Sequence, residues 1–97
     1  MVSTRERAIA WSFLRRRLNE GASDLLQALT TQQFLRPHAS LTEAMQVIAG
    51  QKHFSHNLGT EAIERTDLDP ASSIGRLRKV DLIRLARHAA RLTMSEQ

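Results

Sequence analysis

Two histidines stand at a spacing that metal sites use. His53 and His56 are three residues apart, so one helical turn would bring both imidazoles to the same side. A zinc site would need a further ligand, but the side chains that could supply one follow no recognisable pattern. These are Glu61, Asp67, Asp69 and His38. Histidines in an exposed loop are the favoured explanation of the pair, and we expect no metal ion and no other cofactor.

Catalytic motifs are missing from the sequence as well. The chain has no cysteine, which removes thiolate nucleophiles, disulfides and cysteine-type zinc sites. No G-x-S-x-G elbow, phosphate-binding loop or catalytic pair of carboxylates occurs, and the glycines are scattered as helix punctuation. We therefore expect neither enzymatic activity nor a small-molecule substrate.

Arginine is the residue type that points to binding. The chain has 14 Lys plus Arg against 10 Asp plus Glu, a formal net charge of +4, and its only lysines are Lys52 and Lys79. Arginine favours bidentate contacts with carboxylates or phosphates, so the excess fits an acidic protein and a nucleic acid equally well. With one tryptophan, three phenylalanines and no tyrosine, the chain has no stacking platform for single-stranded nucleic acid.

Two groups of arginines are arranged differently. Arg84, Arg87 and Arg91 repeat at three and four residues, so a helix would present them as one basic strip beside His88. The three consecutive residues 15–17 point three ways around a helix and form no single patch, which favours a solvated surround. A solvated face would also explain the strip, while an acidic protein or a phosphate backbone would give it a function.

A long helix near the start of the chain would position the first group. Ser3 and Glu6 have capping-box spacing, and no proline interrupts the helical composition up to about Thr31. One side of this helix carries a narrow apolar seam, an arc of about 80° of the coiled-coil type. The seam consists of Trp11, Leu14, Leu18, Ala22, Leu25 and Leu29. Gly21 is a possible break, but the continuous seam favours one helix.

The first helix has more apolar surface than one seam requires. Ile9 and Phe13 lie almost opposite the seam, which implies a second contact. Trp11 is either a core residue or an interface residue, because aromatic residues and arginine dominate binding hot spots. A domain of 97 residues often gains stability from a partner subunit, so we expect self-association through this helix.

Two short helices are expected to follow. Ser40 and Glu43 form a second capping box, which predicts a helix of about ten residues that ends at Gly50. Residues 51–59 are expected to form a loop, after which Thr60 caps a short helix that closes at residues 68–70.

The last helix is expected from about Asp81 to Met94 and is amphipathic, with the basic strip opposite its apolar side. That apolar side holds Leu82, Ile83, Leu85, Ala86, Ala89, Ala90 and Leu92. No alternating apolar and polar pattern typical of strands occurs anywhere. The sequence therefore predicts one all-α domain over residues 1–97, with a long first helix, two short helices and an amphipathic C-terminal helix.

The segment 60–83 resembles the helix–extended–helix unit of SAP domains and of the N-terminal region of the Rho transcription terminator. The matching residues are Thr60-Glu61-Ala62-Ile63 and Ile74-Gly75-Arg76-Leu77-Arg78-Lys79-Val80-Asp81-Leu82-Ile83. Some members of that class bind nucleic acid through this unit. The resemblance implies that Arg76, Arg78 and Lys79 would make the contacts.

These observations together favour a small regulatory protein that acts by binding. We expect a cytoplasmic homodimer that docks on a larger protein such as a transcription regulator, because the sequence contains neither a signal peptide nor a membrane span. The expected protein contacts are Ile9, Trp11, Phe13, Arg84, Arg87 and Arg91. The alternative is a basic nucleic-acid-binding module that uses Arg76, Arg78 and Lys79.

Overall fold

Four α-helices and one 3₁₀ turn make up the computed structural model, which describes the backbone of residues 4–96 and the side chains of residues 12–95. The elements are α1 (Thr4–Leu35), α2 (Leu41–Lys52), α3 (His56–Arg65), η1 (Ile74–Arg76) and α4 (Lys79–Glu96). Residues 4–96 contain no β-strand and a single antiparallel bridge, between Ser40 and Ser73. The predicted all-α architecture of four helices is confirmed.

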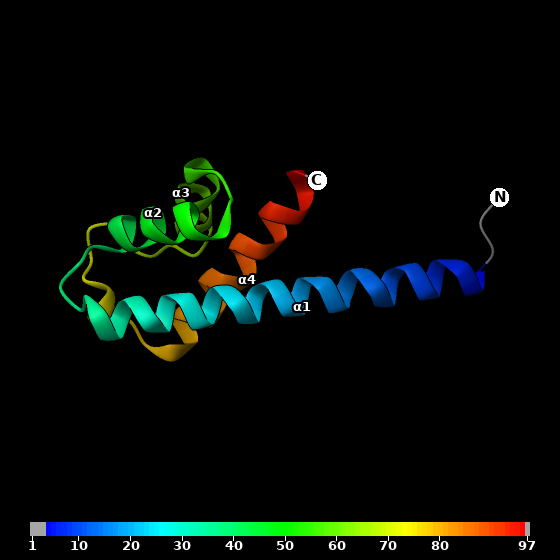
Figure 1. Ribbon diagram of the computed structural model, residues 1–97, viewed down its shortest axis with the longest axis horizontal. Helices are drawn as coiled ribbons and strands as arrows, with labels where there is room; N and C mark the ends of the chain where they lie inside the picture. Colours follow the sequence, from blue (N-terminus) through cyan, green and yellow to red (C-terminus); the bar gives the residue numbers. More distant parts are fainter. Residues whose placement is uncertain (1–3, 97) are drawn as a thin grey trace.

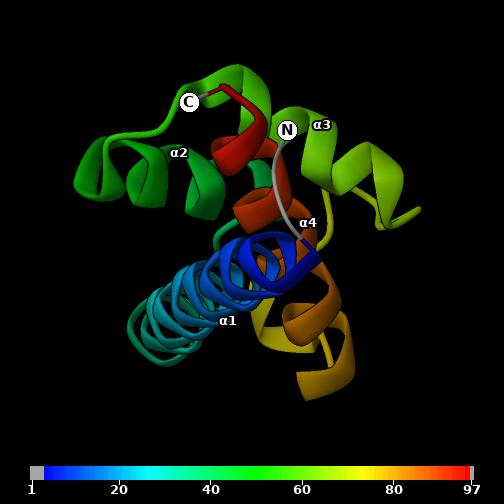
Figure 2. The same ribbon diagram turned by 90° about the vertical axis from the view of Figure 1, so that its right-hand side faces the viewer.

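Helix α1 runs along nearly the whole molecule, while the other helices gather on its C-terminal half (Figure 1). Its 32 residues correspond to about 48 Å of helix, against a longest molecular extent of 52 Å. Helix α4 crosses α1 and makes the most extensive contact between helices. Helices α2 and α3 lie together on one side of α1 (Figure 2). As a result, the N-terminal half of α1 projects beyond the rest of the molecule.

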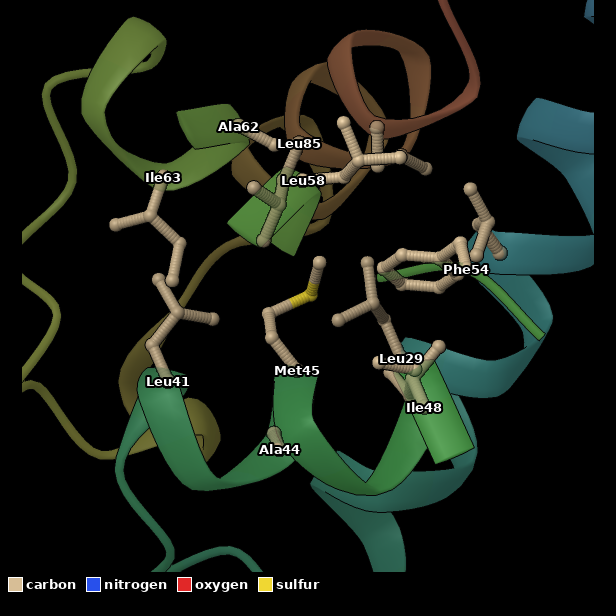
Figure 3. Packing of buried hydrophobic residues seen from close by; sticks show 14 of the residues in the cluster. Leu29, Leu41, Ala44, Met45, Ile48, Phe54, Leu58, Ala62, Ile63 and Leu85 are labelled. Atoms are coloured by element: carbon tan, nitrogen blue, oxygen red, sulfur yellow. The ribbon is translucent and has the colours of Figure 1, made fainter. Parts of the chain in front are cut away.

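The core lies where the four helices meet, and every helix contributes to it. Its largest side chains with almost no exposed surface are Leu29, Leu41, Met45, Ile48, Ile74, Leu82 and Leu85. Met45 of α2 lies at the centre of the cluster in Figure 3, between Leu58 on one side and Leu29 with Phe54 on the other. Burial of these side chains, at about 25 cal/mol per Å² of apolar surface, is the main force that holds the helices together.

Helix α1 is continuous at Gly21, as the seam predicts. A Cβ placed on Gly21 would lie 3.7 Å from the Cβ of Ala90, so α4 crosses α1 at this glycine. The helix ends at Leu35, two residues before Pro37, which agrees with the bias of residues before proline away from helical conformation. Ala90 and Gly21 are small, and their size lets the two backbones approach closely.

Helix α2 begins as its capping box predicts. The Ser40 hydroxyl accepts a hydrogen bond of 3.1 Å from the amide of Glu43. The predicted end at Gly50 is wrong, because α2 continues to Lys52 and stops at His53, whose φ of 58° is left-handed. Gly50 is therefore an interior helical residue, and a glycine there costs only about 1 kcal/mol relative to alanine.

The loop predicted for residues 51–59 is also wrong. Helix α3 starts at His56, and its N-cap is Ser55, whose hydroxyl accepts from the amide of Leu58, rather than Thr60. Gly59 is buried inside this helix, and a Cβ there would lie 3.3 Å from the Cβ of Met45. This glycine is thus a close-packing residue between α2 and α3 and not a helix stop. Helix α3 ends at Arg65, before the predicted closure at residues 68–70.

The connector between α3 and α4 is fastened to the loop that follows α1. The Ile74 amide donates to the Ala39 carbonyl at 2.8 Å, and the Gly75 amide donates to the Pro37 carbonyl at 2.9 Å. A Cβ on Gly75 would lie 2.7 Å from the carbonyl oxygen of Pro37, so the close approach requires glycine. From α1, the side-chain amide of Gln33 donates to the carbonyls of Ile74 and Leu77.

Helix α4 begins at Lys79, two residues before the predicted start. Asp81 stabilises this end, because its carboxylate accepts from the Arg78 amide at 3.2 Å. Most of the predicted apolar side is buried, namely Leu82, Leu85, Ala86, Ala89, Ala90 and Leu92. The prediction was wrong for Ile83, which is only half-buried because it lies at the margin where α4 packs against α1.

Candidate interaction surfaces

The projecting part of α1, residues 4–17, is named the arm here, and residues 18–96 are named the body. Among the arm side chains that the structure describes, residues 12–17, all are exposed. Phe13 keeps 59% of its surface exposed and Leu14 keeps 45%, although both are large apolar side chains. An exposed Phe–Leu pair next to three arginines is costly to solvate, which makes the arm a candidate contact surface.

The charge of the molecule is divided between arm and body. The arm sequence contains five arginines and one glutamate, whereas residues 18–97 contain nine basic and nine acidic residues. The formal net charge of +4 thus lies entirely on the arm. A cationic segment next to a neutral body attracts an acidic partner to one end of the molecule.

The predicted apolar seam is also divided between the arm and the body. Leu25 and Leu29 are 6% and 1% exposed, because α2 and α4 of the same chain cover them. Leu18 and Ala22 are partly buried against the same core, while Leu14 lies beyond it. The side chains of Ile9 and Trp11 lie outside the described residues. Among the seam residues whose side chains the structure describes, only Leu14 is exposed, and self-association through the first helix stays a prediction.

The basic strip on α4 is present at the surface. Arg84, Arg87 and Arg91 are all exposed, as the spacing predicts. The three arginines are not equivalent, because the Arg84 guanidinium donates to the carbonyl of Thr66 at 3.5 Å. Thr66 is the C-cap of α3, and a cation there stabilises the negative end of that helix. Arg84 therefore has a structural contact that Arg87 and Arg91 lack.

The three basic residues that are expected to contact a nucleic acid lie close together in the sequence, at the start of α4. Arg76, Arg78 and Lys79 are exposed. Asp81 partly neutralises this group, since its carboxylate lies 3.7 Å from the Nε of Arg78. The segment 60–83 consists of the second half of α3, a connector with one 3₁₀ turn and the beginning of α4. The resemblance to a helix–extended–helix unit stays a prediction.

A groove between α1 and the first half of α4 was not anticipated from the sequence. Half-buried Leu26 and Ile83 lie in it, and Lys79 and Arg87 line it toward its two ends. The remaining lining residues are Asn19, Ala22, Ser23, Gln27, Thr30, Thr31, Gln33 and Leu82. The sequence feature that could have indicated this groove is the pair Ile83 and Arg87. These two residues are four positions apart on α4 and face the polar side of α1.

A smaller pocket lies on the opposite side of the crossing between α1 and α4. Leu25, Phe54 and Ala90 form its apolar part. An ion pair at the rim joins the Lys52 ammonium to the Asp24 carboxylate at 3.1 Å. The ion pair is exposed, so it contributes at most about 1 kcal/mol to stability, but it ties the end of α2 to α1.

The described residues include neither a metal-binding cluster nor a membrane-spanning helix. Within the described part of the chain, no group of three or more His, Asp or Glu is arranged to hold a metal ion. His53 and His56, the predicted loop pair, are exposed on either side of the start of α3. No helix in that part is both long and apolar enough to cross a membrane.

Comparisons with known proteins give no relative from which a role could be transferred. No family model matches the sequence, and no significant match was found among curated proteins or solved structures. The fold and the surfaces described above are therefore the basis for a functional proposal.

Proposed function

We propose that this chain is a non-enzymatic interaction module that inserts its arm into an acidic, apolar cleft of a larger protein. The observation that carries the proposal is the exposure of Phe13 and Leu14 on a projecting helix that holds the whole net charge. Such a helix has the composition of helix-in-groove ligands, in which apolar anchors give affinity and arginines give orientation. A regulatory role, for example on a transcription regulator, is the class of function that fits such docking.

The arrangement of the anchors supports a cleft over a flat surface. Phe13 and Leu14 are consecutive, so their side chains point about 100° apart around the helix. Arg15 and Arg16 continue the rotation and are exposed as well. A flat partner or a lipid surface could cover only one of these directions, whereas a cleft with acidic rims contacts both anchors and the arginines that follow them.

The charge of the arm supports a different protein over a second copy. Two arms brought together would each carry +4, and like charges in contact are destabilising. Residues 18–97 carry no net charge, so the body of a second copy has no overall negative charge to attract the arm. Self-association through the first helix is therefore a competing outcome that the following experiment separates from the proposal.

Photo-cross-linking from the arm tests the proposal. A benzophenone amino acid is placed at position 13, and at Gln46 as the matched control, because Gln46 is exposed on α2 away from the arm. Both proteins are irradiated in nuclease-treated native lysate. We expect a covalent adduct with another protein from position 13 alone, reduced at least about tenfold when Arg15 and Arg16 are both changed to Gln.

Four results would count against the proposal: an adduct with a second copy of this chain, equal adducts from positions 13 and 46, loss of the adduct on nuclease treatment, or no adduct. The first result would support the homodimer predicted from the sequence. An adduct that does not respond to the Arg15→Gln/Arg16→Gln change would show that the arginines are only solvated.

The second candidate function is nucleic-acid binding, and three exposed basic residues within four positions favour it: Arg76, Arg78 and Lys79. Any such binding is expected to be weak and to depend strongly on salt, because a few phosphate contacts supply it. Fluorescence anisotropy with duplex DNA tests it, with Arg78→Gln/Lys79→Gln as the variant. Sequence-selective nanomolar binding at physiological salt would place this function above protein docking.

A further inference from the structure

We infer that the groove between α1 and α4 is a second docking site, and that its occupant is a short acidic peptide segment with apolar side chains. The site is separate from the arm and does not depend on the proposed function. Its contacts would come from Lys79 and Arg87 as cations and from Leu26 and Ile83 as apolar surface. Exposed Phe34 lies outside the lining, one helical turn beyond Thr30, and would add a further apolar contact.

The charge of the groove defines the chemistry of the occupant. Lys79 and Arg87 are the only charged residues that line it, and both are basic and exposed. Neither Lys79 nor Arg87 takes part in the ion pairs formed by Lys52, Arg65 and Arg78. Two free cations with no acidic neighbour in the lining complement a ligand that carries carboxylates.

The apolar part of the groove lies between the two cations. Leu26 and Ile83 are half-buried, so each keeps apolar surface that a ligand could cover. Phe34 follows Thr30 by one turn on the same face of α1 and keeps 84% of its surface exposed. An exposed aromatic residue at the end of an apolar groove is a typical anchor in protein interfaces.

The spacing of the cations sets the length of the segment. Lys79 and Arg87 are eight residues apart on α4, which corresponds to about 12 Å along the helix axis. A helical ligand would match this distance with two carboxylates about seven or eight residues apart, and with leucine-like side chains between them. The neutral polar residues of α1 that form the other wall, among them Ser23 and Gln27, can hydrogen-bond without imposing a charge.

A peptide fits this groove better than a phosphate backbone does. A nucleic acid presents phosphates every few ångströms and gains little from contact with Ile83, Leu26 or Phe34. Beside a nucleic acid, those three side chains would either stay exposed or be covered without a gain in binding free energy. The combination of two separated cations with the apolar side chains of Leu26 and Ile83 between them resembles helix-in-groove recognition.

The test uses the full chain and a synthetic probe. The probe is a fluorescent amphipathic peptide of about four helical turns, with glutamates about seven residues apart that flank leucines. Its control is the same peptide with glutamine for glutamate. Binding is followed by fluorescence anisotropy, and the site is located by amide chemical shifts in an NMR titration.

The protein variants are matched in charge. Lys79→Gln/Arg87→Gln removes the two groove cations, and Arg76→Gln/Arg91→Gln removes two exposed cations that lie outside the lining and take no part in the ion pairs named above. Phe34→Ser tests the aromatic anchor, and its exposure means that folding is retained. Arg15→Gln/Arg16→Gln removes charge from the arm. This variant therefore shows whether the peptide binds in the groove or on the arm.

We expect the groove variant to bind the peptide at least about tenfold more weakly, and both the arm variant and the matched control to change binding by less than about twofold. Phe34→Ser should also weaken binding, and the shifts should centre on Leu26, Ile83 and Arg87. The inference is overturned by any of four results: equal loss in the groove variant and its matched control, shifts confined to the arm, no binding up to about 1 mM peptide, or tighter binding of duplex DNA in the groove.

Discussion

The two halves of α1 have the same helical backbone and opposite surroundings. In the C-terminal half, Leu25 and Leu29 are buried by α2 and α4, and Gly21 marks the point where α4 crosses. In the N-terminal half, Phe13 and Leu14 are exposed, and the arm contributes the net charge. One apolar seam thus serves intramolecular packing at one end and remains open at the other, so amphipathic pattern alone does not tell a core from an interface.

The largest predicted effect separates the two ends of the seam. Leu29→Ala should lower the free energy of unfolding by about 2.5–5 kcal/mol, because Leu29 is 1% exposed and its loss leaves a cavity. Leu14→Ala should cost less than about 0.5 kcal/mol, because Leu14 lies outside the body. Urea denaturation of both variants measures the difference. Equal losses would mean that the arm is buried in the free protein.

The second prediction concerns how the body is closed. Gly75→Ala should destabilise the protein by about 1–3 kcal/mol, because its Cβ would lie 2.7 Å from the Pro37 carbonyl oxygen, a backbone atom. Gly50→Ala is the control, since a Cβ there meets nothing within 4 Å. Gly50→Ala should be neutral or stabilising by up to about 1 kcal/mol. Thermal melts of the two variants measure the difference. Similar melting temperatures would contradict the close approach between Gly75 and Pro37.

The third prediction addresses the junction between arm and body. Gly21→Ala should stabilise the protein by up to about 1 kcal/mol, because alanine has the higher helix propensity and its Cβ fits 3.7 Å from Ala90. The gain should appear as a higher midpoint in urea. A loss of stability would indicate that α1 and α4 approach more closely than the structure shows, or that flexibility at Gly21 matters.

The smallest predicted effect distinguishes the arginines of α4. Arg84→Gln should cost about 0.5 kcal/mol, because it removes the 3.5 Å hydrogen bond to the Thr66 carbonyl and a cation at the end of α3. Arg91→Gln should leave stability unchanged, since surface substitutions without such a contact rarely have a measurable effect. Parallel urea titrations compare them. Identical urea midpoints would show that the contact between Arg84 and Thr66 contributes nothing to stability.

The fold was largely predictable from the sequence because helix signals are local. The capping box at Ser40 and the seam across Gly21 are patterns within one element, and both hold in the structure. Gly50 and Gly59 were misleading, because a glycine signals a helix end only where its backbone leaves the helix. Gly59 lies inside α3 because Met45 packs against it, and contacts between helices cannot be deduced from local patterns.

The candidate surfaces were only partly predictable for the same reason. The exposure of Phe13 follows from its place opposite the seam, and the strip on α4 follows from residue spacing. The groove does not, because it depends on how α4 crosses α1. Ile83 was assigned to the core on periodicity, yet the crossing leaves it half-buried beside Leu26.

Hydrogen–deuterium exchange along α1 of the free, full-length chain tests the division between arm and body most directly. We expect strong protection of the amides from Leu18 to Leu35, because these amides exchange only when the body unfolds globally. The amides of residues 4–17 should exchange fast at every protein concentration. Uniform protection along the whole helix, or protection of the arm that rises with concentration, would contradict this division, because the arm would then already be covered by a second copy of the chain.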